Sequence, residues 1–296
     1  MSEPDIDTDD DGWVPPDQAP AADLPVHARE RLTEMRQKRF FTSDLTVNEF
    51  LLVKEAGFEP LGLVMGSSIY KITPNIPFGA GDGELEAMTQ ALYHSRELAM
   101  TRMEEEADAL GADGIIAVKL DVKLHAWGKN VAEFLAVGTA VRHRGGGAYR
   151  NKAGKPFQSD LTGQDFWTLL RAGYRPVGFV MGNCVYYVSA NTVRAGGRWS
   201  ASSESLRHTH ALYDARELAI ERLQAEAEDL DATGIVGVTV DLKQHGWGGA
   251  ILGKGNAALR NGELIELFVI GTAVIPMDQP LEIPKPTLVI PVGGTR

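Results

Sequence analysis

The stretch VKLDVKLHAWG, Val118 to Gly128, returns 120 residues later as VTVDLKQHGWG, Val238 to Gly248. Alternate residues from Val118 to Leu124 are apolar, and the residues between and after them are charged or polar, ending at His125. Because side chains along a strand alternate between its two faces, this pattern predicts a strand with one buried and one solvated face. The repetition indicates that the chain contains this strand twice.

The rest of the chain repeats in the same order. SDLTVNEF is followed 116 residues later by SDLTGQDF, AGFEPLGLVMGSSIY by AGYRPVGFVMGNCVY, and, at larger offsets, ALYHSRELA by ALYDARELA and AEFLAVGTAV by IELFVIGTAV. The conserved order of the blocks indicates a duplicated domain. The offset grows to 133 at the last block, so the second copy contains extra residues, most of them within GGAILGKGNAALRNGEL, where we expect a longer surface loop.

Each copy is predicted to run helix, strand, helix, strand, strand. Thr46 with Glu49, and Thr162 with Asp165, have the spacing of a residue that caps a short helix and an acid in its first turn. Residues 84–110 carry apolar side chains at mostly helical spacing, which predicts a long helix. The long helix is then expected to cover one face of the sheet.

The polar face of the repeated strand has a structural explanation. If the strand turns back over residues 126–130, Lys123 stands opposite Glu133, and Lys243 and Glu266 hold the same aligned positions in the second copy. Such a cross-strand pair contributes about 0.2–1 kcal/mol to stability. The Trp just past the strand is expected to cover the mouth of the hairpin or a neighbouring subunit.

The composition is that of a soluble globular protein: 44% of the 296 residues are hydrophobic and 23% are charged, and the length suggests two domains. No apolar run approaches the ~20 residues that cross a bilayer, and the N-terminus is acidic, unlike a secretory signal. The single cysteine, Cys184, cannot form a disulfide within the chain, which fits a reducing compartment. We therefore expect a cytoplasmic protein without a membrane span.

Most of the net charge of −11 lies in the N-terminal tail. Residues 1–28 contain eight acidic residues and no Lys or Arg, which leaves −3 for the remainder, so no nucleic-acid-binding face is indicated. The tail is poor in large apolar residues, and we predict that it is disordered and available to a protein partner. The acidic residues are Glu3, Asp5, Asp7, Asp9, Asp10, Asp11, Asp17 and Asp23.

The blocks SRELA and ARELA, LGADGI before the alternating strand and VGTAV in the last strand resemble the YbjQ-like family, present here as two tandem copies. The resemblance implies an α+β fold in which each copy, similar to a dodecin subunit, packs a helix on a three-stranded antiparallel sheet. It also implies assembly, because domains of this kind form a ring of five in single-domain relatives. A homo-oligomeric ring is therefore expected here, either as a pentamer of chains with two stacked rings or with the copies alternating around one ring.

The expected domain organisation follows from the repeat. The segments are an acidic disordered tail with a short basic segment (1–39), a first YbjQ-like domain (40–142), a flexible linker (143–156), a second YbjQ-like domain (157–275) and a Pro-rich C-terminal extension (276–296).

The resemblance to the YbjQ-like family implies a heavy-metal-binding domain, but the sequence contains one cysteine and no CxxC or HxxxH pattern for a soft metal. The repeated candidates for a divalent metal ion are two histidines and the carboxylates near them, and assembly would have to bring several copies together. Solvated or Trp-packed histidines are the simpler interpretation. The candidate ligands are His125, His245, Asp121, Asp241, Glu133 and Glu266.

No repeated group of residues indicates catalysis. Arg96 and Arg216 hold one position in the two long helices, but no nucleophile or base repeats beside them, so we expect them to pair within the helix or between subunits. The favoured hypothesis is a non-enzymatic, oligomer-forming scaffold or binding module. Metal or small-ligand binding between the repeated domains is the alternative, and an unidentified enzyme is the third hypothesis.

Overall fold

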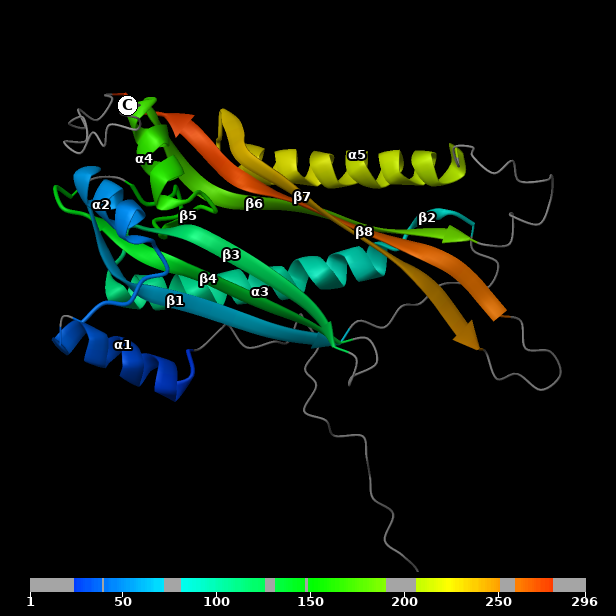
Figure 1. Cartoon of the computed structure of the whole chain (residues 1–296), viewed down its shortest axis with the longest axis horizontal. Helices are drawn as coiled ribbons and strands as arrows, with labels where there is room; N and C mark the ends of the chain where they lie inside the picture. Colours follow the sequence, from blue (N-terminus) through cyan, green and yellow to red (C-terminus); the bar gives the residue numbers. More distant parts are fainter. Residues whose placement is uncertain are drawn as a thin grey trace, which may run out of the picture.

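The structure, a computed structural model, describes residues 24–38, 40–71, 81–125, 131–146, 149–189, 206–250 and 259–278. These residues form a mixed α+β protein with five helices and two sheets (Figure 1). The first copy contains α2 (Val47–Glu55), β1 (Phe58–Lys71), α3 (Glu86–Leu110), β3 (Gly114–His125) and β4 (Val131–His143). The second contains α4 (Gly163–Arg171), β6 (Tyr174–Ser189), α5 (Leu206–Asp229), β7 (Gly234–Ala250) and β8 (Leu259–Pro276).

Each sheet has the predicted antiparallel core of three strands, in the order β1-β4-β3 and β6-β8-β7. Each also has a fourth strand of two residues that the sequence did not indicate. β5 (Phe157–Gln158), which leads into the second copy, pairs parallel with β3 of the first. β2 (Gly83–Glu84), which leads into α3 of the first copy, pairs antiparallel with β6 of the second. Each copy thus adds backbone hydrogen bonds to the sheet of the other.

The predicted helix boundaries agree with local chemistry. The Thr46 side chain accepts from the backbone N–H of Glu49, whose carboxylate accepts from the N–H of Thr46, and this reciprocal pair starts α2. Thr162 caps α4 through the N–H of Asp165. Gly111, in the left-handed conformation at φ 74°, ends α3.

The hairpin register is also as predicted: Lys123 lies opposite Glu133 and Lys243 opposite Glu266. A bulge interrupts both ladders shortly before this point, where Ala117 and Gly237 have positive φ angles of 54° and 68°. The strict alternation predicted for the strand therefore begins only after the bulge.

Most of the extra residues of the second copy extend the two strands of the hairpin, where only a longer loop was expected; residues 251–258, between these strands, lie outside the described residues. β7 has 17 residues where β3 has 12, and β8 has 18 where β4 has 13. The physical reason is that backbone pairing continues past the end of the first-copy ladder, to Ala250 opposite Leu259. Trp247 accordingly lies within β7, opposite Gly262, and not past the strand end. Its counterpart Trp127 lies outside the described residues.

Two segments without predicted structure are packed on the first copy. α1 (Val26–Lys38) lies within the segment 1–39; it buries Leu32 and donates from Arg31 to Glu106 of α3 at 2.5 Å. In the expected flexible linker, Arg150 donates to the Asp108 carboxylate and the Ala112 carbonyl, both at 2.7 Å. The tail up to residue 23 and the extension beyond residue 278 lie outside the described residues.

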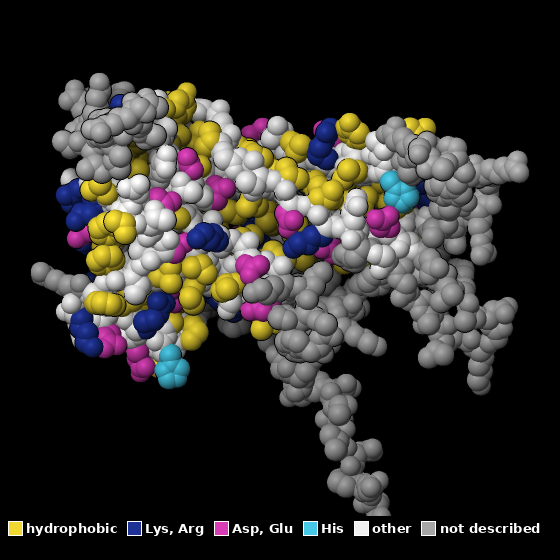
Figure 2. Space-filling model, viewed as in Figure 1, with side chains coloured by type: hydrophobic (Ala, Val, Ile, Leu, Met, Phe, Trp, Pro, Cys, Tyr) yellow, Lys and Arg dark blue, Asp and Glu magenta, His cyan; other side chains and the backbone are white. Residues whose placement is uncertain are grey.

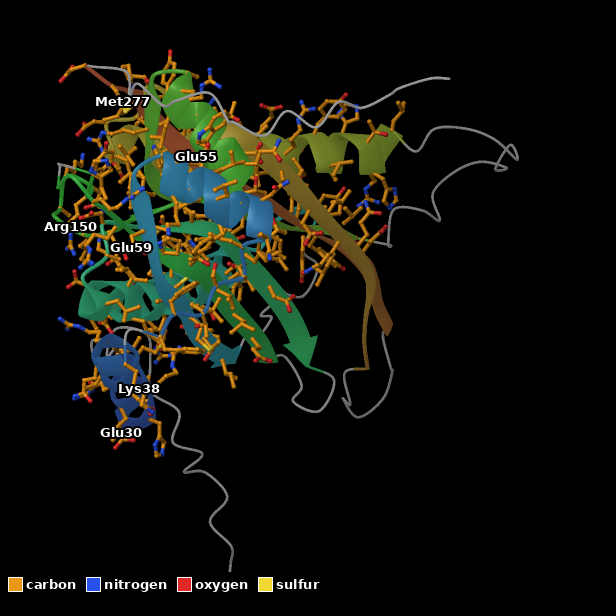
Figure 3. The ribbon with its side chains drawn as sticks, turned by 60° about the vertical axis from the view of Figure 1, so that its left-hand side comes forward. Glu30, Lys38, Glu55, Glu59, Arg150 and Met277 are labelled. Carbon is orange, nitrogen blue, oxygen red and sulfur yellow. The ribbon has the colours of Figure 1, made fainter. Side chains whose placement is uncertain are left out.

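Figure 3 shows α1, with Glu30 and Lys38, on the opposite side of the molecule from Glu55 of α2 and from Met277. Glu55 and Met277 lie beside α4, where the two short helices meet. Helices α1 and α4 therefore contact the first copy on opposite sides.

A glycine lets each long helix approach its sheet. A Cβ at Gly66 would lie 2.0 Å from the Ala99 carbonyl oxygen of α3, and one at Gly182 would lie 1.7 Å from that of Ala219 in α5. Since the obstacle is backbone, no side-chain movement relieves it. The glycine of the repeated Val-Met-Gly sequence, Gly66 in the first copy and Gly182 in the second, thus sets the spacing between helix and sheet.

We predict that Gly182→Ala lowers the free energy of unfolding by about 1–3 kcal/mol, since the added methyl forces α5 away from β6. The comparison variant is Gly246→Ala on β7, where a Cβ meets no atom within 4 Å. Urea denaturation followed by circular dichroism measures both. Equal midpoints for the two variants would contradict this account of the V-M-G glycine.

Candidate functional site

The two copies share one hydrophobic core. β3 of the first copy turns its apolar face, Val118, Leu120 and Val122, into a cluster that also contains side chains of β6 and β8. These three residues are the apolar members of the alternating pattern in the repeated strand. The second-copy members of the cluster are Phe179, Met181, Val185, Tyr187, Leu264, Phe268 and Ile270.

A buried ion pair crosses the same contact. Arg96 of α3 is 2% exposed and donates to the Glu226 carboxylate of α5, as well as to its neighbour Glu97 at 2.8 Å. Burial by itself would lower the pKa of Arg96, but the two carboxylates raise it overall, so the guanidinium stays charged. This confirms the predicted pairing within the helix and adds a partner in the other copy.

Further hydrogen bonds fix how β2 and α3 of the first copy lie against β6 and α5 of the second. Arg222 of α5 donates to both oxygens of Glu84, at 2.7 and 3.0 Å. The Thr89 hydroxyl accepts from the Val185 N–H at 3.0 Å, and the Asn183 side-chain amide donates to the Thr89 carbonyl at 3.0 Å. Because these are directional bonds between polar groups, they define one orientation of the copies.

The segment 157–161 extends the contact along the edge of β3. Ser159 donates to Ile115 at 2.9 Å and accepts from Val118 at 2.9 Å, while the Leu161 carbonyl accepts from Ala117 at 3.0 Å. The Phe157 ring covers Gly114, where a Cβ would lie 2.2 Å from the ring. Gly114 is therefore required for this aromatic side chain to lie flat on the strand.

The short helices complete the contact. Phe157 and Phe166 of the second copy pack with Phe58 of the first, and Phe58 is fully buried. α4 also contacts α2, where Gly163 approaches Glu49 so closely that a Cβ would lie 2.7 Å from the Cβ of Glu49. The contact thus joins strands, long helices and short helices.

The corresponding face of β7 is open. Val118 is 3% exposed, but its counterpart Val238 is 48% exposed, and the next two members of the face, Val240 and Leu242, are 62% and 42% exposed. α5 packs on β6 and β8 and leaves β7 uncovered. Figure 2 shows hydrophobic side chains exposed in this region, between α5 and the first sheet.

The first copy has a matching open face on β1. Met181 of β6 is fully buried against the first copy, whereas its counterpart Met65 is 41% exposed. Ile69, the counterpart of the buried Val185, is 56% exposed. The two methionines therefore differ in burial, because among the described residues only the β6 face has a partner within the chain.

In the first copy, the predicted metal ligands Asp121, His125 and Glu133 lie at backbone positions on one face of the β3–β4 hairpin. Lys123, opposite Glu133, stands between Asp121 and His125 on that face. The His125 side chain lies outside the described part of the chain. The structure therefore places the histidine by its backbone alone.

In the second copy, Asp241, His245 and Glu266 repeat this arrangement, and the His245 side chain is likewise outside the described part. Asp241 forms an ion pair with Lys243 at 3.3 Å, and Lys243 also donates to the Val122 carbonyl at 3.4 Å. Among the described side chains, no three of His, Cys, Asp or Glu come together as metal ligands. The described carboxylate Asp241 is thus engaged by a cation of the protein.

Cys184 is buried beneath α5. Burial raises the pKa of its thiol to about 12, so the group is protonated at neutral pH. Soft metals bind the thiolate, which this environment disfavours.

Within the described ranges, no helix is long and apolar enough to cross a membrane.

Sequence reasoning missed Gly114, Phe157 and Glu226 as contact residues. A signal was present, because aligning the copies places Gly234 on Gly114 and Phe41 on Phe157. A glycine that recurs in a strand favours close approach of another group. What the alignment lacked was the information that the approaching group belongs to the other copy.

Comparison with known proteins identifies the family. The YbjQ_1 family model, described as "Putative heavy-metal-binding", matches residues 60–144 and 173–276. The chain belongs to this family and contains two tandem copies of its domain.

Relatives occur with both one and two copies' length. The chain is 44% identical over 252 residues to "Encapsulin nanocompartment protein Rv1762c" of Mycobacterium tuberculosis, covering 83% of this chain and 89% of the relative. It is 41% identical over 107 residues to a UPF0145 protein of Halorubrum lacusprofundi, covering 34% of this chain and 99% of the relative. A UPF0145 protein of Clostridium novyi is 35% identical over 103 residues, with 33% and 96% covered.

We predict that Arg96→Met destabilises the chain by about 3–5 kcal/mol, because it leaves the Glu226 carboxylate without its cation at the contact between copies. Arg142→Met is the matched control, since Arg142 pairs with Glu59 at 3.6 Å on the surface and its loss costs about 0–1 kcal/mol. Chemical denaturation measures both changes. A loss for Arg96→Met no larger than that for Arg142→Met would show that the buried pair does not hold the copies together.

Proposed function

We propose that this protein is a non-enzymatic scaffold that self-associates into closed homo-oligomers. The observation that carries the proposal is the open apolar face of β7, whose counterpart on β3 is buried by the neighbouring copy. An edge strand that exposes apolar side chains favours association with another chain. The exposed face of β1 supplies the complementary surface.

The two open surfaces differ from one another, so the association is head-to-tail. Contacts of this kind produce a closed ring when the rotation between successive units closes, and a filament when it does not. The family relationship supports the closed form, as does the name of the mycobacterial relative, which calls it an encapsulin nanocompartment protein. We extend to this chain only the role of a building block in a protein assembly.

The side-by-side contact of the copies supports alternation around one ring over two stacked rings. Whole two-copy chains alternating around a ring always contribute an even number of domains. A ring of five domains, as the family resemblance implies for single-domain relatives, therefore cannot be built from whole chains of this protein in that arrangement. The proposal leaves the number of chains to measurement.

We predict a single oligomer of defined size, with a mass that is an integral multiple of 32.1 kDa. A ring, unlike an open chain, has no surface left for the addition of further chains. Light scattering after gel filtration and native mass spectrometry determine that mass. A folded 32.1 kDa monomer at micromolar concentration would refute the scaffold proposal.

A second candidate function is the binding of a divalent metal ion on the polar face of the hairpins. It is favoured by the register, which places Asp241, His245 and Glu266 on one face and repeats this in the first copy. Imidazole and carboxylate are suitable ligands for zinc. Lys243, however, competes for the Asp241 carboxylate, so the described donor set does not by itself form a metal centre.

This second candidate predicts that zinc binds with defined stoichiometry in calorimetric titration. The double variant His125→Ala, His245→Ala is expected to abolish this binding, because a neutral imidazole, unlike a carboxylate, does not form an ion pair with a neighbouring lysine. The control variant is His27→Ala, an exposed histidine on α1. Unchanged zinc affinity in the double variant would exclude these histidines as ligands.

A further inference from the structure

The chain contains one complete copy-to-copy contact and the two unmatched halves of another. We infer that the first copy of a second chain docks on the open β7 face, repeating between chains the contact that joins the two copies within one chain; this inference rests on the proposed self-association and names its surfaces. The docking element is the segment 41–45 followed by α2, and the receiving element is the edge of β7.

Strand addition is the first part of this contact. The segment 41–45 aligns with 157–161, which bonds to the edge of β3. β7 is the edge strand of its own sheet, and its bulge at Gly237 reproduces the one at Ala117 that receives the Leu161 carbonyl. By this correspondence Ser43 of the second chain bonds to Ile235 and Val238, a case of strand addition at a sheet edge.

The aromatic side chain is the second part. Phe41 is 46% exposed and stacks on Phe50 with ring centroids 5.3 Å apart, as the buried Phe157 stacks on Phe166 at 5.9 Å. Phe157 lies on Gly114, whereas the space over Gly234 is open, with Val274 the nearest group to a built Cβ at 3.9 Å. Phe41 of the second chain can therefore lie over Gly234 as Phe157 lies over Gly114.

The ion pair is the third part. Arg216 lies over the Tyr213 ring and donates to Glu217, the pose that Arg96 has with Tyr93 and Glu97. Among the described residues, Arg216 differs from Arg96 in having no carboxylate of the other copy beside it.

The missing carboxylate corresponds to Glu106 of the second chain. Its Oε2 accepts from the Met65 N–H at 3.0 Å and from Arg31 at 2.5 Å, while its Oε1 has no partner among the described residues. In Glu226 the equivalent Oε1 binds Arg96, and Oε2 accepts from the Met181 N–H at 2.9 Å. The Glu106 side chain is 4% exposed within its own chain, so Arg216 can bind Oε1 only after the side chains that cover it move aside.

The contact between chains differs from the internal one at the short helices. Val47, 88% exposed, stands where the internal contact has Gly163, the residue that approaches α2 most closely. A valine there requires α2 of the second chain to lie further from α4. The strand and aromatic parts, rather than the helix pair, therefore carry the contact between chains.

The test uses two variants, each of which disrupts one of the two open surfaces and leaves the other intact. Gly234→Val places a Cβ where the Phe41 ring would lie, and Phe41→Ala removes the ring. Each variant alone is expected to be a monomer. A 1:1 mixture is expected to give a dimer of about twice the chain mass, because it contains one intact surface of each kind. Light scattering measures the masses, and circular dichroism confirms that each variant is folded.

Two matched controls accompany this experiment: Gly81→Val, which precedes β2 and has no atom within 4 Å of a built Cβ, and Phe40→Ala, an exposed neighbour of Phe41. Both are expected to keep the wild-type mass. If folded Gly234→Val and Phe41→Ala also keep the wild-type oligomer, the docking surface is refuted while the scaffold proposal stands. A monomeric wild type refutes both proposals.

A cross-linking experiment tests the register. Gln158 lies opposite Ile115 within the chain, so Thr42 of one chain should lie opposite Ile235 of the next. With Thr42→Cys and Ile235→Cys combined, a short bismaleimide is expected to produce covalent multimers on a denaturing gel, since the native Cys184 is buried. Either single variant should give none. If the double variant remains at the single-chain mass, the β7 face is covered by something else, such as a foreign protein or the extension beyond residue 278, and the inference is wrong.

Discussion

The structure depends on one packing constraint. Each long helix covers only two strands of its three-stranded sheet, so the apolar side chains of the third strand need another partner to be buried. α3 packs mainly on β1 and β4, and α5 on β6 and β8. Within the chain, β3 is covered because the second copy lies beside it. The face of β7 has the same composition but no equivalent cover, and its valines are exposed. Burial of apolar surface is the dominant favourable term in folding and association, so the uncovered third strand links the fold to self-assembly.

The polar groups at the contact give it direction. Arg96 with Glu226, Arg222 with Glu84 and Thr89 with the β6 backbone permit one orientation, whereas apolar faces alone would permit several. Arg216 already has the pose of Arg96 within its own copy. A duplicated chain can thus carry the same docking chemistry twice, used once internally and once available to another chain.

Much of the fold could be predicted because it depends on local patterns. Alternation predicted β3 and β7, helical spacing predicted α3, and the Thr–x–x–acid pairs predicted the starts of α2 and α4. Helix α1 was missed because its stability comes from Leu32 and from the Arg31 bond to Glu106, contacts with residues distant in sequence. The longer β7–β8 hairpin was missed because glycine-rich sequence favours a loop, and only pairing across the hairpin overrides that preference.

By itself the sequence determined the duplication, the family, the order of elements and the hairpin register, since each is written in residues close together or in the repeat itself. It also predicted that His125 and His245 share a strand face with Lys123 and Lys243, which agrees with the backbone register. Only the tertiary structure decided which copy covers which: equivalent residues such as Val118 and Val238, or Met65 and Met181, have the same chemistry but opposite exposure. The physical reason is that burial depends on neighbours brought together by folding, and two identical faces in one chain cannot both be covered by a single neighbouring copy.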